Sequence, residues 1–526
     1  MLNAGHVIRP LVIPSYVILS YVILSYVILS LSKGCRRAVE GRQPRKAVAV
    51  LTDPRRGCTL DDELGIARST FASRAFGGPM KCVTLAVVCA LLTGCGQRDA
   101  GWAGQSALLP ASSRFSSGEY IQHVVVMIQE NRSYDNLFAT FPGGDGATNG
   151  KTHDGKTIRL KQGGLQFDSL GHQHFAFEKE YDHGRMDGFD LVSRAIGRGD
   201  KIPAGNYAYR YVNPESIAPY WALARQYVLA DHMFSTQSSS SFTAHQDLIA
   251  GGTPVGDGEN VIDFPTPSAW GCDAAPGTVT SLITARGHYL RDAGPFPCFT
   301  YATLRDLLDA KGISWLYFTN AMPSSVWNAF DAISAVRNGS EWTQKIVIPQ
   351  RRIFSTVRQG VLPAVSWVIP DALDSDHPGI HSDSGPSWVA RVVDAIGESP
   401  YWDSTAIVVL WDDWGGEYDH VPPPQLDGQG LGMRVPMLVI SAYARRGFAG
   451  QSGFISHQQY EFGSILKFVE DNWHLGRLGT SDVRAKSIAD CFDFTQPPRS
   501  FIPIQAKYSQ SYFERRPASG LPVDTY

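Results

Sequence analysis

Charged residues are scarce in this 526-residue chain, at 18% of the total, beside 51 glycines, 32 prolines and 11% aromatic residues. This composition excludes a coiled coil, a collagen and wholesale disorder, and the length is sufficient to bury a large core. An excess of positive charge is also missing from the body. Residues 1–79 carry a net +6, which leaves −9 for residues 80–526. An acidic body of this kind indicates that nucleic acid is not a partner.

Cysteine is sparse after residue 95, where only Cys272, Cys298 and Cys491 remain. Their spacing lacks the paired Cys/His pattern of a structural zinc site. Cys272 and Cys298 lie close together in a loop rich in glycine and proline. In an oxidising compartment this pair is expected to form a disulfide that closes a long loop.

The N-terminal segment contains a low-complexity repeat, in which Ser-Tyr-Val-Ile-Leu occurs three times between Ser15 and Ser30. A period of five matches neither a helix nor a strand. Residues 11–31 are apolar enough to span a membrane. The alternative is a translated DNA repeat upstream of the true start. We favour the alternative for residues 1–79, because a second export signal with its own methionine follows.

That second signal runs from Met80 to Cys95: one lysine, a short apolar stretch and a small-residue cleavage site. The sequence Leu92-Thr93-Gly94-Cys95 resembles a bacterial lipobox, which predicts that Cys95 carries the lipid anchor. A plain signal peptide with a chance cysteine is the alternative. Residues 96–117 are polar and small, as in a flexible tether. We therefore expect an exported protein, periplasmic or at the cell surface, attached to the membrane through Cys95.

Beyond residue 118 short apolar runs alternate with amphipathic stretches. Continuous β-branched runs predict strands that are buried on both faces. The predicted strands are residues 123–128, 364–369, 406–410 and 437–440, and the predicted helices are residues 304–311, 387–396 and 462–473. Residues 118–526 are therefore expected to form one α/β domain, a parallel sheet with helices on its faces.

Two of these predicted strands run directly into polar side chains. Glu130 and Asn131 follow the first strand, and Asp412 and Asp413 follow the run at residues 406–410. Open parallel sheets bind ligands beyond the carboxyl ends of their strands. Three carboxylates would repel one another there unless a cation lies between them. A helix cap at Asn131 and a turn at the aspartates are the structural alternative. The coincidence at two strand ends favours a metal site.

A serine-rich segment, residues 235–246, precedes the apolar Leu248-Ile249-Ala250. A hydroxyl at a helix N-terminus near a cation is a candidate nucleophile, although such serines are more often caps. Histidines in polar loops are candidates to contact phosphate or to protonate a leaving group, although each alone is more often a surface residue. They are His172, His174, His377 and His457.

Several motifs together resemble the bacterial phosphoesterase family, which unites phospholipases C with a periplasmic acid phosphatase. The opening segment is similar to its Glu-Asn-Arg-Ser-Phe-Asp-x-x-Phe signature, and the later motifs follow in the same order. These segments are residues 123–138, 181–189, 375–378, 411–420, 432–436 and 456–457. The resemblance covers about residues 118–503, and an ordered set of motifs is more specific than any one of them.

The resemblance implies an alkaline-phosphatase-like fold with three α/β/α layers, and a metal-dependent hydrolase of phosphate esters that acts through a phosphoserine. It implies one or more divalent metal ions, and it leaves a phosphomonoester or a phospholipid as the substrate. Ser240 remains an alternative nucleophile and His174 an alternative to His172. The implied metal ligands are Glu130, Asn131, Asp412 and Asp413, and the implied catalytic residues are Ser241, His172, His377 and His457. A catalytically inactive surface lipoprotein that binds phosphorylated ligands is the second reading.

Overall fold

The computed structural model describes residues 117–196, 200–266, 270–320, 325–447, 453–521 and 523. The predicted leader and signal, the lipidated Cys95 and the tether up to residue 116 lie outside the described residues. Within the described ranges no helix combines the length and the apolar character that a membrane crossing requires.

The described part of the chain is built on a nine-stranded sheet with the order β14-β13-β15-β1-β16-β17-β8-β18, in which β19 also pairs with β8. Its strands are β14 (Ile346–Val347), β13 (Trp315–Phe318), β15 (Val365–Val368), β1 (His123–Gln129), β16 (Thr405–Trp411), β17 (Arg434–Ser441), β8 (Val228–Phe234), β18 (Phe454–Ser456) and β19 (Tyr460–Glu461). All of these strands are parallel except β17, which is antiparallel to both of its neighbours.

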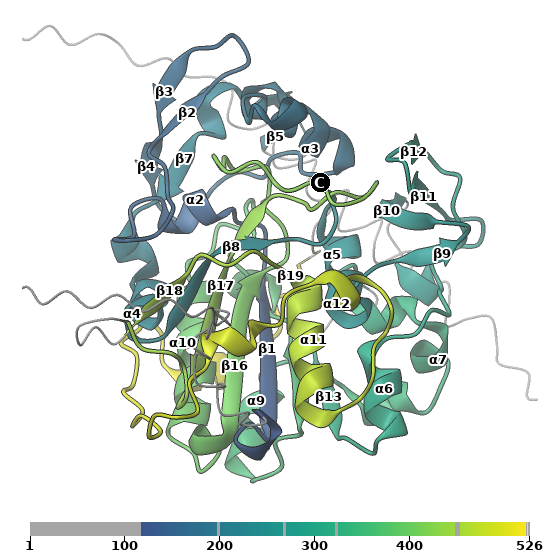
Figure 1. The fold of residues 1–526 in the computed structure, drawn as a ribbon. Helices are drawn as coiled ribbons and strands as arrows, with labels where there is room; N and C mark the ends of the chain where they lie inside the picture. The colour runs from purple at the N-terminus through teal and green to yellow at the C-terminus, as the bar shows by residue number, and fades with distance from the viewer. Residues whose placement is uncertain are drawn as a thin grey trace, which may run out of the picture. The chain divides into compact units, whose positions relative to one another are not determined.

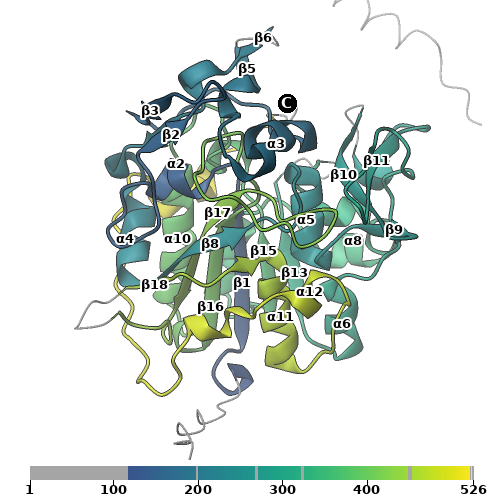
Figure 2. The same ribbon diagram turned by 45° about the horizontal axis from the view of Figure 1, so that its top comes forward.

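Helices cover both faces of this sheet (Figures 1 and 2). One group packs around α10 and the other around α11. The first group is α4 (Ala218–Gln226), α9 (Arg352–Arg358), α10 (Gly385–Gly397) and α13 (Gln510–Arg515). The second is α5 (Ser241–Ala250), α6 (Leu304–Ala310), α11 (Phe462–Trp473) and α12 (Ser481–Arg484). The prediction of a three-layer α/β/α domain with a mostly parallel sheet is confirmed.

The four predicted strands are present as β1, β15, β16 and β17. The predicted helices are α6, α10 and α11, and α11 has the predicted bounds. Strands β1 and β16 are buried almost throughout, as their continuous apolar runs require. The direction of β17 differs from the predicted parallel arrangement, because a run of buried residues does not reveal strand direction. Strands β8 and β13 were not predicted.

A smaller four-stranded antiparallel sheet, β12-β11-β10-β9, follows α5. Three two-stranded pairings and four short α-helices are the other strands and α-helices of the described residues. The small sheet is β9 (Pro254–Gly256), β10 (Glu259–Thr266), β11 (Val279–Thr284) and β12 (Tyr289–Leu290). The remaining elements are β2 (Asn149–Lys151), β3 (Thr157–Arg159), β4 (Lys161–Gly163), β5 (Ser193–Ile196), β6 (Asp200–Pro203), β7 (Arg210–Val212), α2 (Tyr134–Phe138), α3 (His174–Tyr181), α7 (Ser334–Arg337) and α8 (Glu341–Gln344).

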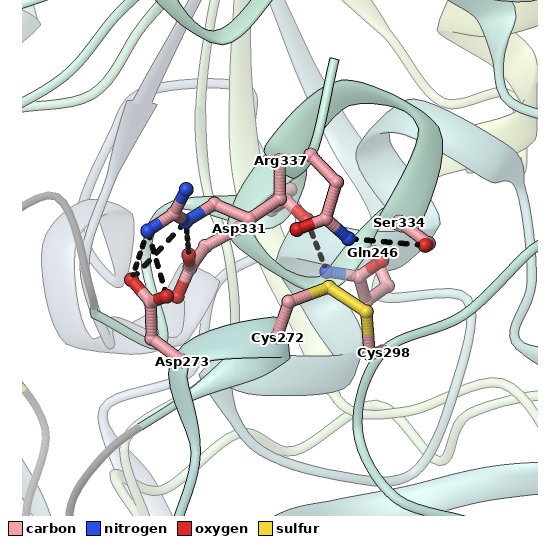
Figure 3. Close-up of a disulfide and its surroundings, with 9 residues drawn as sticks. Gln246, Cys272, Asp273, Cys298, Asp331, Ser334 and Arg337 are labelled. Carbon is pink, nitrogen blue, oxygen red and sulfur yellow. Dashed lines mark hydrogen bonds and ion pairs between the residues drawn. A yellow bond between two sulfur atoms is a disulfide. The ribbon is translucent and has the colours of Figure 1, made fainter. Parts of the chain in front are cut away.

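Cys272 and Cys298 form a disulfide, as predicted, and close a loop between β10 and α6 (Figure 3). Beside it, Arg337 pairs with Asp273 at 2.7 Å and with the buried Asp331 at 3.3 Å. The disulfide therefore closes the loop, and the ion pair between Arg337 and Asp273 attaches the loop to α7. Cys491 is a free, buried thiol.

Candidate active site

The site begins where β1 and β16 end. The two strands are parallel neighbours, and their last residues, Gln129 and Trp411, are paired in register. Glu130 and Asn131 therefore leave the sheet at the same level as Asp412 and Asp413. The four side chains are fully buried, so two segments 281 residues apart meet at one edge of the sheet, where parallel sheets bind ligands.

Hydrogen bonds join these two strand ends. The Asn131 amide N–H donates to Asp412 Oδ1 at 3.0 Å, and Asn131 Nδ2 donates to Asp413 Oδ2 at 3.4 Å. Asn131 has a left-handed backbone with φ +60°, and Gly415 also has a positive φ of +63°. A Cβ on Gly415 would lie 2.5 Å from the Asn131 carbonyl oxygen. The close approach of the two loops thus requires glycine at this position.

Ser241, the first residue of α5, also contacts this group. Its Oγ donates to Asp413 Oδ2 at 3.2 Å, so Asn131 and Ser241 share one carboxylate oxygen. The neighbouring Ser240 is the N-cap of α5, and its buried Oγ makes no hydrogen bond within the described residues. The geometry therefore brings Ser241, and not Ser240, to the carboxylates.

The serine-rich segment is fastened to the small sheet. Ser239 Oγ donates to Asp263 Oδ1 at 3.0 Å and accepts from the Asp263 amide N–H at 2.8 Å. Asp263 also accepts from the His174 amide N–H at 2.7 Å. Burial raises the pKa of Asp263. These bonds fix the turn that delivers Ser241 to the start of α5.

His245 is a component that the sequence analysis did not assign. Its Nε2 lies 3.0 Å from Glu130 Oε1 and 3.8 Å from Asp412 Oδ2. One ligand atom from each of these three residues lies within 4.8 Å of the other two. The available signal was helical spacing, because residues four apart, such as Ser241 and His245, share one face of a helix.

The donor set fits a divalent cation. Oxygen from carboxylates and an amide with one imidazole nitrogen is a usual combination for such ions. Asn131 Oδ1 and Asp412 Oδ2 are buried and accept no hydrogen bond from the described residues. Buried oxygens without donors are costly, and a cation coordinated there would satisfy them. Glu130, Asn131, Asp412 and Asp413 fit the group that the sequence predicted, and His245 adds a nitrogen donor.

Two of the predicted histidines, His172 and His377, are neighbours, and His172 lies beside the carboxylates. His172 Nδ1 lies 2.7 Å from the Leu170 carbonyl oxygen, which can only accept, so Nδ1 carries a proton. His172 Nε2 then faces Asn131 Nδ2 at 2.9 Å and lies 4.0 Å from Asp413 Oδ2. The ring of His377 is centred 6.4 Å from that of His172. His172 thus lies on the Asn131 side of the site, and His377 lies next to His172.

The other two histidines are placed differently. His174 Nδ1 contacts the Ser238 carbonyl oxygen at 2.9 Å, and its ring stacks on Tyr289. His457 lies with Asp231, whose Oδ2 is 2.7 Å from His457 Nδ1. The geometry therefore favours His172 over His174 as the residue nearest Asp413, and it puts His457 in another cluster of side chains.

A layer of buried hydrogen bonds supports the His377 loop. Asp376, which has a left-handed φ of +70°, accepts from Tyr220 Oη at 2.6 Å. Burial raises the pKa of Asp376 to about 6. The guanidinium of Arg132 donates from Nε to the Asp376 carbonyl oxygen at 3.0 Å. Arg132 follows Asn131 directly, so the loop that carries Asn131 and the loop that carries His377 hold each other in place.

A model of the phosphoesterase family matches residues 121–476. This covers more than half of the chain, and the chain belongs to that family, as its motifs predicted.

Individual relatives are phospholipases C. The chain is 26% identical to a non-hemolytic phospholipase C of Pseudomonas aeruginosa, over 77% of this chain and 62% of that protein. It is 24% identical to a non-hemolytic phospholipase C of Burkholderia pseudomallei, over 81% and 68%. It is 23% identical to non-specific phospholipase C1 of Arabidopsis thaliana, over 73% of each chain. The alignment thus spans less than two thirds of the Pseudomonas protein.

A solved protein of the alkaline phosphatase superfamily from Vibrio parahaemolyticus aligns with a TM-score of 0.32 and 11% identity, over 71% of this chain and 72% of that one.

Proposed function

We propose that this protein is a metal-dependent hydrolase of phosphate esters in which Ser241 is the nucleophile. One observation carries the proposal: Ser241 Oγ lies at the N-terminus of α5 and shares Asp413 Oδ2 with Asn131, inside a buried group of three carboxylates. Membership of the phosphoesterase family and the phospholipase C relatives support it.

Five residues would hold the cation: Glu130, Asn131, Asp412, Asp413 and His245. A divalent ion bound there supplies positive charge that favours the serine alkoxide and offsets the charge of the phosphoryl oxygens. The protein keeps this ion-binding position away from bulk water, since all five side chains are buried.

The reaction of the chain itself is a double displacement. Ser241 Oγ donates its proton toward Asp413 Oδ2 and attacks phosphorus, so that a P–O bond to serine forms while the P–O bond to the leaving alcohol breaks. The N-terminus of α5 favours the negative charge on the serine oxygen. His172 and His377 are the candidates to protonate the leaving alkoxide, and the one that does so must enter the reaction with a second proton, on Nε2, because its Nδ1 proton is held by a backbone carbonyl oxygen. Water then cleaves the phosphoserine and releases the phosphoryl product.

A phospholipid is the substrate we favour, because the relatives in both bacteria and a plant are phospholipases C. Phosphomonoester hydrolysis is the alternative within the same chemistry. Trp327 and Trp414, whose rings lie near His377 and His172, are fully buried. They pack behind the histidines and do not form an exposed apolar entrance.

An inactive protein that binds phosphorylated ligands is the second candidate. Loss of catalysis during evolution is expected to remove ligands or the nucleophile first. Ser241 and all four predicted ligands stand together in the described residues, which favours the enzyme.

Export and lipid anchoring at Cys95 remain our proposal from the lipobox. The disulfide between Cys272 and Cys298 is compatible with an oxidising compartment. Mass spectrometry of the mature N-terminus tests the anchor. A diacylated cysteine at position 95 supports it, and an unmodified N-terminus or peptides from residues 1–79 contradict it.

The decisive test of the function is a side-by-side assay of phosphatidylcholine and a chromogenic phosphate monoester. The protein is stripped with a chelator and then reloaded with single divalent ions. We expect release that depends on the ion, with phosphatidylcholine as the better substrate. Turnover of neither substrate under any ion, with bound ion demonstrated, would favour the inactive binder.

A further inference from the structure

Strands β8 and β18 are neighbours at one edge of the large sheet (Figure 1). A second group of histidines and carboxylates lies on and next to these strands. Asp231 and His232 belong to β8, and His457 directly follows β18. Asp231 Oδ1 lies 2.9 Å from His232 Nδ1, and Asp231 Oδ2 lies 2.7 Å from His457 Nδ1. One ligand atom from each of the three residues lies within 4.8 Å of the other two. We name these three residues the edge cluster.

His232 has a carboxylate oxygen at both ring nitrogens. Asp231 Oδ1 faces its Nδ1 at 2.9 Å, and Asp145 Oδ2 faces its Nε2 at 3.2 Å. A neutral imidazole has one N–H, and an ionised carboxylate only accepts. One of the two contacts would therefore oppose two lone pairs, unless a cation lies between the atoms or the ring carries a second proton.

The charges around the edge cluster also favour a bound cation. His420 also lies between two carboxylates, with Asp135 at 2.7 Å and Asp145 at 3.3 Å. Among the described residues, Arg434 is the one lysine or arginine that pairs with these aspartates. It is occupied by Asp419 at 3.0 Å and by Asp135 at 3.3 Å, and it reaches Asp145 only at 3.6 Å. Asp231 is fully buried, and its carboxylate accepts from the Asp145 amide N–H at 2.9 Å. Arg434 Nη1 donates to the Asp231 carbonyl oxygen at 2.9 Å, and in the described ranges the Asp231 carboxylate forms ion pairs with the two histidines and with no arginine or lysine.

We propose that Asp231, His232 and His457 bind one divalent transition-metal ion of the zinc type. Ligand atoms about 2.0–2.1 Å from a tetrahedral ion lie about 3.3 Å apart. One ligand atom from each of the three residues lies within 4.8 Å of the other two, and each histidine Nδ1 contacts one oxygen of the Asp231 carboxylate, at 2.7 and 2.9 Å. With the ion on Nδ1, His232 Nε2–H donates to Asp145. A metal-bound histidine commonly donates its other N–H to a carboxylate in this way.

The ion has a structural role in this arrangement. β18 is the last strand of the sheet and pairs only with β8 within the described residues. An ion held by Asp231 and His232 on β8 and by His457 after β18 therefore fastens the edge strand to its neighbour. The His457 side chain is 58% exposed, so water can complete the coordination. No residue of the edge cluster belongs to the set around Ser241, and the edge site is independent of the proposed catalysis.

The test measures bound zinc directly. The full chain is dialysed against Zn²⁺ at pH 7.5, and zinc per chain is determined by mass spectrometry for the parent, His457→Ala, and the double variant His232→Gln/His457→Ala. His153→Ala is the matched control, because His153 is also a partly exposed histidine paired with an aspartate, Asp190. We expect one zinc fewer in His457→Ala and in the double variant, and no change in His153→Ala.

Cobalt separates this site from the active site. Asp413→Asn weakens the proposed catalytic site and leaves the edge cluster intact. In that background Co²⁺ should still produce the visible absorption of a tetrahedral ion, and His457→Ala should remove it. Because His457 is exposed, its replacement does not endanger folding, which circular dichroism checks. Zinc content and cobalt absorption that are the same with and without His457 would overturn the edge site, whatever happens at Ser241.

Discussion

Ser241 Oγ donates a hydrogen bond to Asp413 Oδ2 across 3.2 Å, and so joins the first residue of α5 to the second residue after β16. The same oxygen accepts from Asn131, the second residue after β1. Three elements of the fold therefore converge on one carboxylate. This convergence explains why a hydroxyl in a serine-rich segment is singled out from its neighbours.

Replacing Ser241 by alanine should reduce kcat for any phosphate ester by about 10³-fold or more, since no positioned oxygen remains to attack phosphorus. The matched control is Ser240→Ala. Its hydroxyl has no hydrogen-bond partner in the described residues, so most activity should remain. Steady-state kinetics of both variants provides the comparison, and similar losses in the two would remove Ser241 from its special position.

Asp413→Asn should weaken ion binding and lower turnover by about 10²-fold or more, because the shared oxygen loses its charge while the size of the side chain is kept. Metal content after dialysis and thermal unfolding are both measured. We expect less bound ion in a folded protein. Asp403→Asn, an exposed aspartate just before β16, serves as the control. Equal catalytic-site metal in Asp413→Asn and the parent would show that Asp413 is not a ligand.

His245→Gln tests the residue that sequence reasoning missed. The imidazole nitrogen lies 3.0 Å from Glu130 Oε1, and its loss should weaken ion affinity by about 10- to 100-fold, as for other contributors to a metal site. Titration of the stripped protein with the activating ion gives the affinity. The exposed His288→Ala is the control. An unchanged titration curve would assign His245 to packing alone.

Glu417→Gln should flatten the dependence of stability on pH. Burial raises the pKa of Glu417 to about 8 from its ordinary value of 4.5. The folded state therefore keeps the proton after the unfolded state has lost it. Below pH 4.5 the Glu417 carboxyl is protonated in both states and does not change the free energy of unfolding. As pH rises from 4.5 toward 8, the unfolded state loses this proton first, and the free energy of unfolding falls by at most about 1.4 kcal/mol per pH unit.

The glutamine variant keeps the neutral shape and has no such penalty. Urea unfolding at pH 5, 6.5 and 8 should therefore show a stability difference between variant and parent that grows in favour of the variant with pH. A difference that is constant across the three values would mean that Glu417 is ionised in the folded protein at all of them.

Much of the sheet was predictable because its central strands are continuous apolar runs. The run from His123 and the run ending at Leu410 carry no internal charge, and each ends in polar residues. Strand β8 escaped prediction because Asp231 and His232 interrupt its apolar pattern. Those two residues are also the ones that form the edge cluster. The direction of β17 was not predictable, since a strand buried on both faces has the same pattern in either direction.

The candidate site was predictable in its parts and not in its assembly. Strand-end motifs identified Glu130 and Asp413, but the pairing of β1 with β16 that brings them together is a property of the folded sheet. His245 needed knowledge that α5 begins at Ser241. His457 illustrates the converse, because a motif match does not specify which cluster a side chain joins. Its partner, Asp231, lies on a strand that the sequence pattern concealed.

The central claim is covalent attack by Ser241, and trapping of the intermediate tests it most directly. The protein is mixed with a phosphate ester labelled in the phosphoryl group, quenched in acid during turnover and digested for peptide mapping. We expect label on the Ser241 hydroxyl in the parent and none in Ser241→Ala. Label on Ser240, or rapid turnover with no labelled peptide, would contradict it.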